Sequence, residues 1–197
     1  MPILTKGRSM IVLALTSASL FSFTTLQDSP GEELAKMEQL GEYLAEPGKQ
    51  HEFLQNFVGD WTTESSIFGM EPTTGTASNE LILGGRFLEG EYSGTIIDSA
   101  YEGKITLGYD KYKRKYIVTF IDSLGTSIKY AEGFLDKSNR TLSLWGSMDE
   151  WMTGEHDKVV LYRFTIQNKN QFTLGIHDLA MYPNDAKVIE IVYKRSE

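Results

Sequence analysis

Residues 101–109 read YEGKITLGY, and the alternation within this stretch decides the fold class of the chain. Every second residue belongs to a set that can face a core: Tyr101, Gly103, Ile105, Leu107 and Tyr109. The residues between them are Glu102, Lys104, Thr106 and Gly108. A period of two residues is typical of a half-buried β-strand, with one face against a core and the other in water. The stretch therefore predicts a strand of an antiparallel sheet.

Nine further runs of this kind surround the first one. They cover residues 61–68, 77–83, 86–94, 115–121, 127–135, 140–146, 158–166, 171–177 and 187–194. Turn-forming residues separate them, for example at 122–125, 136–139 and 168–170. No segment between strands is long enough for the helical crossover of a parallel sheet. The sequence thus predicts an all-β antiparallel meander or barrel of about ten strands, with no internal repeat and no interdomain linker.

The longest irregular segment is predicted at residues 146–157, which read GSMDEWMTGEHD. Met148, Trp151 and Met152 alternate there with acidic residues, and a fully solvated loop has little reason to carry such large apolar side chains. One interpretation is that the segment plugs an end of the core. The other is that it covers a ligand cavity, since loops on rigid scaffolds often carry binding roles.

Helical patterns precede the strands. Ser29 can cap a helix that has Pro30 in its first position and Glu32 completing a capping box, and the pattern ends at Gly48. A second pattern of one or two turns, from Phe53 to Val58, leads into Gly59. We therefore expect a helical N-terminal segment over residues 28–50, with one or two short helices before the strands, and a barrel domain over residues 51–197.

Residues 1–27 have the layout of a secretory signal peptide. Lys6 and Arg8 precede an apolar run of 14 residues, 10–23, and small and polar residues follow it. A membrane-spanning helix needs roughly 20 mainly apolar residues, so we expect cleavage, between residues 18 and 27, and no retained span. The predicted location is periplasmic or extracellular.

Composition excludes several classes of partner. The chain has no cysteine, so neither a lipidated cysteine nor a disulfide can anchor or cross-link it. The formal charge is -8, and it becomes -10 without residues 1–18, because two cations and no acid leave. Nucleic acid and anionic membranes are poor partners for such a chain. The basic cluster Lys111, Lys113, Arg114 and Lys115 is interpreted as a solvated turn.

Gly59 and Trp61 open the first predicted strand of the barrel domain, and Arg195 lies at the end of the last one. This arrangement resembles the closure signature of the calycins, the lipocalin-like barrels. Glycine allows a tight entry into the strand, the indole of Trp61 can plug the barrel base, and a guanidinium can stack on that ring. We expect Gly59, Trp61 and Arg195 to serve this structural role.

A wider set of motifs extends along the barrel domain: His51-x-x-Leu54, Gly59-x-Trp61, Leu83-Gly84-Gly85-Arg86, Gly108-Tyr109-Asp110, Asp122-x-x-Gly125, Gly133 and Tyr193-x-Arg195. Together these motifs resemble the bacterial family called domain of unknown function 1579. They cover roughly residues 51–195. The resemblance implies a calycin-like barrel, and it implies no activity and no catalytic residue.

No catalytic constellation is recognisable in the sequence. A nucleophile elbow, a catalytic thiol, a Walker loop and a dinucleotide fingerprint are all missing. Glu89 and Glu91 share one face of a strand, but Leu88 and Tyr92 on the other face are the natural core residues. We interpret the two carboxylates as solvent-facing, and we assign no catalytic residue.

Three histidines are the candidates for metal or haem ligation. His51 is expected to be a helix cap or a surface residue. His156 lies between Glu155 and Asp157, in what is predicted as a solvated acidic loop. His177 shares strand parity with Thr173 and Gly175, so it is expected to face solvent or a neighbouring loop. Haem binding would need His177 or His156 to turn inward. We therefore predict no metal site and no cofactor, with haem as a minor alternative.

Binding of a small, largely apolar molecule is the function that the sequence favours. Thr63 and Ser65 share the inward face with Trp61, and such small side chains leave room inside a barrel. The predicted lining residues are Tyr92, Tyr109, Trp145 and Trp151, because aromatic walls with polar tips suit such pockets. The alternative is a structural or protein-interaction module with a solid core, in which the 29–48 helix or the Trp151 segment docks a partner that the sequence does not identify.

Overall fold

The computed structural model of this chain describes residues 29–96, 99–150, 153–180 and 186–197. The helical elements are α1 (Pro30–Ala45), α2 (Lys49–Glu52) and the 3-10 helix η1 (Phe53–Phe57). The strands are β1 (Gly59–Ile67), β2 (Thr73–Ile82), β3 (Phe87–Ile96), β4 (Ser99–Asp110), β5 (Lys115–Asp122), β6 (Lys129–Leu135), β7 (Thr141–Glu150), β8 (Glu155–Asn168), β9 (Gln171–Asp178) and β10 (Ala186–Arg195). Contacts group residues 1–38 and 39–197 into two compact units. The predicted signal peptide, residues 1–27, lies outside the described residues.

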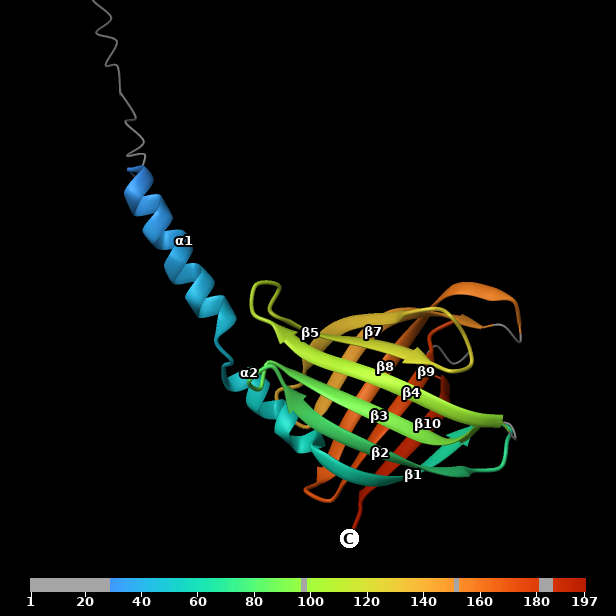
Figure 1. Cartoon of the computed structure of the whole chain (residues 1–197). Coiled ribbons are helices and arrows are strands. Elements are labelled where there is room, and N and C mark those ends of the chain that lie inside the picture. Colours follow the sequence, from blue (N-terminus) through green and yellow to red (C-terminus); the bar gives the residue numbers. More distant parts are fainter. Residues whose placement is uncertain (1–28, 97–98, 151–152, 181–185) are drawn as a thin grey trace, which may run out of the picture. The chain divides into compact units, whose positions relative to one another are not determined.

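The ten strands form one closed antiparallel barrel (Figure 1). Each strand pairs with its neighbours in sequence, and β1 pairs with β10 to close the cylinder. The prediction of an all-β antiparallel barrel of about ten strands is confirmed, and the barrel is consistent with a calycin-like fold. All ten predicted runs are strands, although several start earlier, as β2 does at Thr73.

The prediction of an irregular segment at residues 146–157 is largely wrong. Strand β7 continues to Glu150 and β8 already begins at Glu155, so these strands include most of the segment. The pairing partners Glu150 and Glu155 close the hairpin, and Lys158 bonds both carboxylates. Acidic residues that suggested a solvated loop therefore belong to a paired hairpin. Trp151 and Met152 lie outside the described residues.

Helix α1 begins with the capping box that the sequence predicts. The backbone N–H of Ser29 donates to the Glu32 carboxylate at 2.8 Å, and the N–H of Glu32 donates to the Ser29 hydroxyl at 3.3 Å. These reciprocal bonds satisfy donors that the first helical turn leaves without a partner. The hydrogen bonds from Ser29 also lower the pKa of Glu32.

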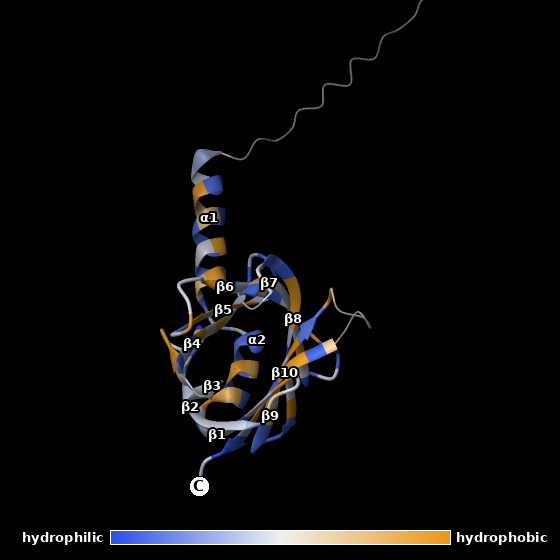
Figure 2. Cartoon of the chain, turned by 90° about the vertical axis from the view of Figure 1, so that its right-hand side faces the viewer, coloured by the Kyte–Doolittle hydropathy of each residue, from blue (hydrophilic) through white to orange (hydrophobic). Residues whose placement is uncertain are grey.

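The 3-10 helix η1 plugs one end of the barrel, which we call the base. Phe53, Leu54 and Phe57 of η1 are buried in the core that the strands enclose. The Phe57 ring packs edge-on against Phe172, with 5.0 Å between ring centroids. In Figure 2, which looks along the barrel, α2 and η1 lie across its far end. The opposite end, where β5 ends at Asp122 and β6 begins at Lys129, is the mouth.

Three residues at the base join the first strand to the last. Trp61 of β1 is the pairing partner of Arg195 of β10, and the Arg195 guanidinium carbon lies 4.2 Å from the centroid of the indole. Arg195 Nη1 also donates to the carbonyl of Val58 at 3.0 Å. Gly59 has a φ of 120°, and a Cβ there would collide with the Arg195 guanidinium. Glycine at this position therefore lets the arginine lie over the ring.

Candidate ligand cavity

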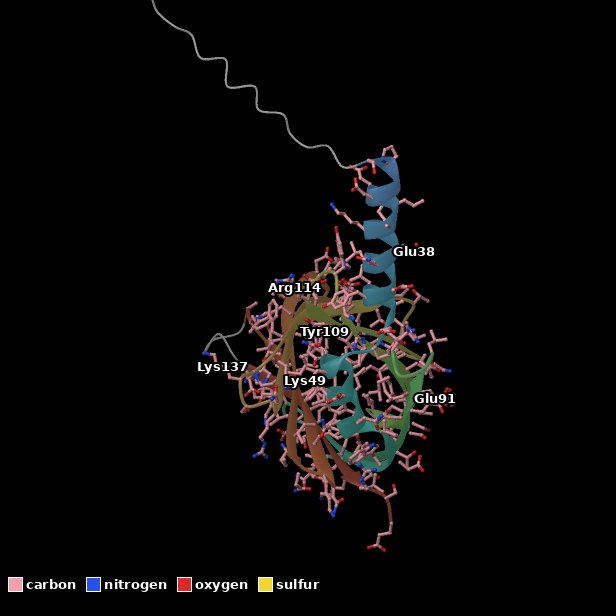
Figure 3. The ribbon with its side chains drawn as sticks, turned by 90° about the vertical axis from the view of Figure 1, so that its left-hand side faces the viewer. Glu38, Lys49, Glu91, Tyr109, Arg114 and Lys137 are labelled. Atoms are coloured by element: carbon pink, nitrogen blue, oxygen red, sulfur yellow. The ribbon has the colours of Figure 1, made fainter. Side chains whose placement is uncertain are left out.

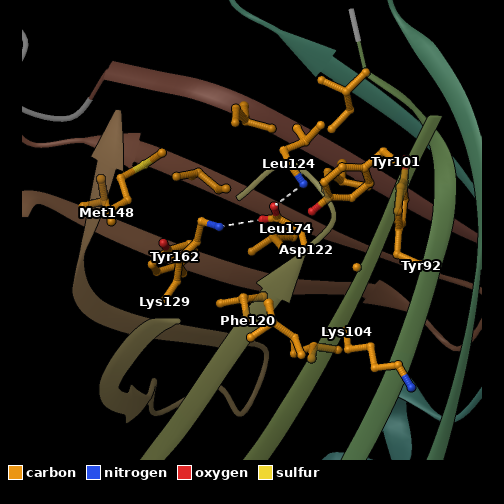
Figure 4. Close-up of a pocket in the computed structure, with 18 of the residues that line it drawn as sticks. Tyr92, Tyr101, Lys104, Phe120, Asp122, Leu124, Lys129, Met148, Tyr162 and Leu174 are labelled. Atoms are coloured by element: carbon orange, nitrogen blue, oxygen red, sulfur yellow. Dashed lines mark hydrogen bonds and ion pairs between the residues drawn. The ribbon is translucent and has the colours of Figure 1, made fainter. Parts of the chain in front are cut away.

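The barrel interior contains a cavity of about 680 Å³. Its wall is mostly apolar and comes from the inward faces of nearly all strands, including Leu88, Leu107, Phe120, Val160, Leu174 and Ile191 (Figure 4). The volume lies within the range of roughly 300 to 1,000 Å³ that small-molecule pockets occupy. The interior is therefore large enough to hold a ligand.

A group of tyrosines lines the cavity toward the mouth. The hydroxyls of Tyr92 and Ser65 are 3.1 Å apart and share a hydrogen bond, and the rings of Tyr92 and Tyr101 meet edge-on at 5.3 Å. Tyr162 stacks on Phe120, with 5.0 Å between ring centroids and 28° between the planes. Burial raises the pKa of Tyr101 above its usual value and that of Tyr162 to about 12. Both phenols are therefore protonated at neutral pH.

An ion pair lies at the mouth between β5 and β6. Lys129 Nζ is 2.5 Å from Asp122 Oδ2, and the two side chains are only 20% and 11% exposed. The backbone N–H of Leu124 donates to the other carboxylate oxygen of Asp122 at 3.0 Å. Figure 4 shows both interactions beside Tyr162 and Tyr101. The charges of this pair are therefore already compensated.

A second charged cluster is centred on Lys158 of β8. Its ammonium lies 2.7 Å from Asp178, 2.5 Å from Glu150 and 3.0 Å from Glu155. The hydrogen bond to Asp178, followed by those to Glu150 and Glu155, raises the pKa of Lys158. Asp178 is 2% exposed, and its buried charge is compensated by the lysine and by the backbone N–H of Ala180, which donates to Asp178 Oδ1 at 2.8 Å. This cluster has one cation and three carboxylates.

The chain matches the family described as "Protein of unknown function (DUF1579)" over residues 46–195. The chain belongs to this family. The resemblance expected from the sequence motifs is thus confirmed, and membership in the DUF1579 family assigns no activity.

Two further comparisons accompany the DUF1579 match. No curated protein matches the chain. Among solved structures, the chain is similar to a redesigned β-barrel, with 13% sequence identity and a TM-score of 0.39 over 73% of this chain and 95% of that one.

The four lining residues predicted for this DUF1579 protein have different locations. Tyr92 lines the cavity. Tyr109 lies at the base, where its ring contacts His51 and Tyr116 at 5.9 and 4.9 Å; Figure 3, a view from that end, labels it together with Lys49. Trp145 is on the outer face of β7 and 46% exposed, so it does not line the cavity. Trp151 lies outside the described residues.

The locations of the three histidines agree only in part with those predicted from the sequence. His51 acts as a cap, because its Nδ1 accepts the Gly48 N–H at 3.0 Å, but it is 7% exposed and not a surface residue. His177 has the predicted outward parity, yet it is also 7% exposed because its ring lies over Gly175, where no side chain competes for the space. Neither His177 nor the exposed His156 lines the cavity.

Neither a metal-ligand cluster nor a membrane-spanning helix occurs among the described residues. No group of three or more His, Cys, Asp or Glu side chains in that part of the chain is arranged to hold a metal ion. No helix among the same residues has the length and apolar character needed to cross a membrane.

Several cavity residues were not predicted as such. Tyr101 and Tyr162 belong to alternating runs, and their inward parity was the signal that could have identified them. Asp122 was predicted in a turn, and Lys129 lay in the predicted strand 127–135 without an assigned face. A charged residue on an inward face is uncommon. Their mutual pairing and the Leu124 N–H bond to Asp122 compensate these charges in the folded barrel.

Proposed function

We propose that this DUF1579 protein is exported and binds a small, largely apolar molecule inside its barrel. The observation that carries the proposal is the cavity of about 680 Å³ with a mostly apolar wall. Burial of apolar ligand surface in such a cavity supplies a driving force of roughly 25 cal/mol per Å². A close-packed interior would have favoured the alternative of a solid structural module. The signal-like residues 1–27 are the support for export.

The base and the walls are suited to this role. Phe53, Leu54 and Phe57 of η1 close one end with apolar side chains, so a ligand has an apolar floor to rest on. The continuous hydrogen bonding around the cylinder fixes the wall, which limits the ordering cost of binding. A preformed cavity of this kind can bind a ligand without a reaction step and without a cofactor.

The test combines native mass spectrometry with a displacement assay. Protein purified from its own host is expected to carry a small molecule that is released on denaturation. Ligand-free protein is expected to bind the neutral fluorescent probe N-phenyl-1-naphthylamine. Met148 lines the cavity at the mouth, so Met148→Trp should weaken probe binding about tenfold or more by occupying the space. Trp145→Phe, on the outer face of the same strand, is the matched control and should bind the probe like the wild type.

Two results would argue against ligand binding. One is the absence of a copurified molecule together with no binding of the probe. The other is probe binding that Met148→Trp leaves unchanged and Trp145→Phe abolishes, because the apolar site would then be on the outer surface.

A further inference from the structure

The Tyr162 hydroxyl is buried at the cavity wall without a hydrogen-bond partner among the described residues. The residue is 2% exposed, and its ring is held by stacking on Phe120. Leaving a buried hydroxyl unpaired costs about 1 to 3 kcal/mol, so native proteins rarely retain one without a role. Because burial and the nearby Asp122 raise its pKa to about 12, the phenol keeps its proton and remains a donor.

The charged side chains that line the cavity already have partners. Two described lysines point inward, and each lies close to a carboxylate: Lys129 is 2.5 Å from Asp122 and Lys158 is 2.7 Å from Asp178. The Lys104–Glu91 pair at the edge of the lining is on the outer face and more than half exposed. Apart from the outward-facing Glu91, the described lining has five carboxylates against the two inward lysines, so negative charge is in excess. An anionic head group would find no unpaired cation here and would be repelled by this excess.

A cationic head group would be attracted by this excess, but the most buried carboxylates of the lining already have partners. Asp122 accepts hydrogen bonds from both Lys129 and the Leu124 backbone, and Asp178 is bonded by Lys158. Burying an ammonium ion without a dedicated counter-charge is costly. Thr63 and Thr73 also have buried hydroxyls without a partner, but among the described residues that line the cavity the buried donor without one is the phenol of Tyr162. A carbonyl oxygen matches it best, because a carbonyl accepts a hydrogen bond without adding a donor of its own.

We propose that the ligand is an uncharged, largely apolar molecule with a carbonyl oxygen, and that the Tyr162 hydroxyl donates a hydrogen bond to that oxygen. The inference rests on the proposed function, since it specifies the chemistry of the same cavity. Stacking on Phe120 fixes the phenol in position before the ligand arrives. The apolar wall holds the body of the ligand, and Tyr162 orients its polar end.

The experiment uses the full chain and one phenyl-hexyl skeleton that carries, in turn, no head group, a ketone, a carboxylate or an ammonium. Affinities are measured near neutral pH by displacement of N-phenyl-1-naphthylamine. The ketone should bind about tenfold tighter than the hydrocarbon, as expected for one added hydrogen bond of about 1.4 kcal/mol. The carboxylate and the ammonium should bind more weakly than the ketone.

Tyr162→Phe should remove the tenfold advantage of the ketone and leave the affinity for the hydrocarbon unchanged within about twofold. Tyr130→Phe is the matched control, because Tyr130 is 42% exposed on the outer face of β6 and its hydroxyl bonds Glu132, and it should keep the advantage of the ketone. The melting temperature of ligand-free Tyr162→Phe should equal or exceed that of the wild type, since the substitution removes an unpaired polar group.

Different failures have different meanings. Displacement of the probe by the hydrocarbon, with no ketone advantage or with equal losses for both ligands in Tyr162→Phe, would overturn the role of Tyr162 but leave apolar binding intact. Tightest binding by the carboxylate or the ammonium would overturn the proposed ligand class. If neither the probe nor any member of the series binds, the proposed function itself fails.

Discussion

Arg195 lies over the indole of Trp61, with its guanidinium carbon 4.2 Å from the ring centroid, and the two residues are direct partners in the pairing of β1 with β10. The indole N–H of Trp61 donates to the carbonyl of Phe57 at 2.9 Å. A single side chain thus connects the plug helix, the first strand and, through the arginine, the last strand.

Arg195→Ala should lower the free energy of unfolding by about 1 to 2 kcal/mol. The substitution removes a cation–π contact and the guanidinium hydrogen bonds to the Val58 and Lys169 carbonyls. Urea denaturation measures the change. Lys194→Ala, at the exposed neighbouring position, should change stability by less than about 0.5 kcal/mol. Equal effects of the two substitutions would show that the arginine has no special role.

Gly59→Ala should destabilise the barrel by about 1 to 3 kcal/mol. Its φ of 120° is unfavourable for any residue with a Cβ, and that Cβ would also displace the Arg195 guanidinium. Gly41→Ala is the control, because the helical Gly41 has no atom within 4 Å of an added Cβ. That control should be neutral or slightly stabilising, by up to about 1 kcal/mol. The two variants can be compared by thermal or urea unfolding, and a Gly59→Ala protein as stable as the wild type would contradict this account of closure.

Asn79→Ala should cost about 1 to 3 kcal/mol of stability. The Asn79 side-chain amide donates to the Phe57 carbonyl at 2.9 Å, inside the core and beside the Trp61 bond to the same oxygen. Ser78→Ala, one residue earlier, removes only an exposed hydrogen bond to Asp60 and should cost less than about 0.5 kcal/mol. Denaturant titrations of both variants test the difference. A similar loss for each would mean that burial does not strengthen the Asn79 bond.

Stability should fall as the pH drops below about 6.5, because burial lowers the pKa of His51 in the folded state. The positive charges of Lys111 and Arg86 act in the same direction. The unfolded chain then binds a proton at His51 more readily than the folded chain does. The stabilisation that neutral His51 provides is therefore fully present above the pKa of His51 in the unfolded chain, and it is lost as the pH falls toward the lower pKa of His51 in the folded protein. Urea midpoints between about pH 8 and pH 5 report the effect.

The controls for this pH dependence are two histidine variants. His51→Asn should flatten the fall in stability between about pH 6.5 and pH 5, because the group that titrates is gone. His156→Asn, whose histidine side chain is 83% exposed, should retain the wild-type profile. A wild-type profile in His51→Asn would assign the pH dependence to other groups.

The strands could be predicted from the sequence because alternation along one strand is a local signal. Tyr101 to Tyr109 shows this directly, and the inward residues of β4 follow that parity. Closure could be expected from Gly59, Trp61 and Arg195 once the resemblance to calycins was recognised. The ion pairs at the mouth could not be predicted from the sequence, because the pairing of Lys158 with Glu150 and Asp178 joins three different strands.

The location of single side chains depended on neighbours that no sequence pattern specifies. Tryptophan is a residue type that often lines pockets, but the register of β7 directs Trp145 outward while Leu144 and Gly146 face inward. His177 is covered because Gly175, two residues earlier on the same face, leaves space for its ring. The missing partner of Tyr162 is likewise a property of the folded cavity and has no signature in the chain.

Closure between the first and last strands has a consequence for how the protein folds. The bond from Arg195 to Val58 joins residues 137 positions apart, so the cylinder cannot be completed until the final strand has been synthesised. Such long-range pairing slows folding, and until it forms, β1 and β9 present unsatisfied edges to other chains. A chain that lacks β10 is therefore prone to aggregate, and pairing of β10 with β1 and β9 is the step that removes both exposed edges.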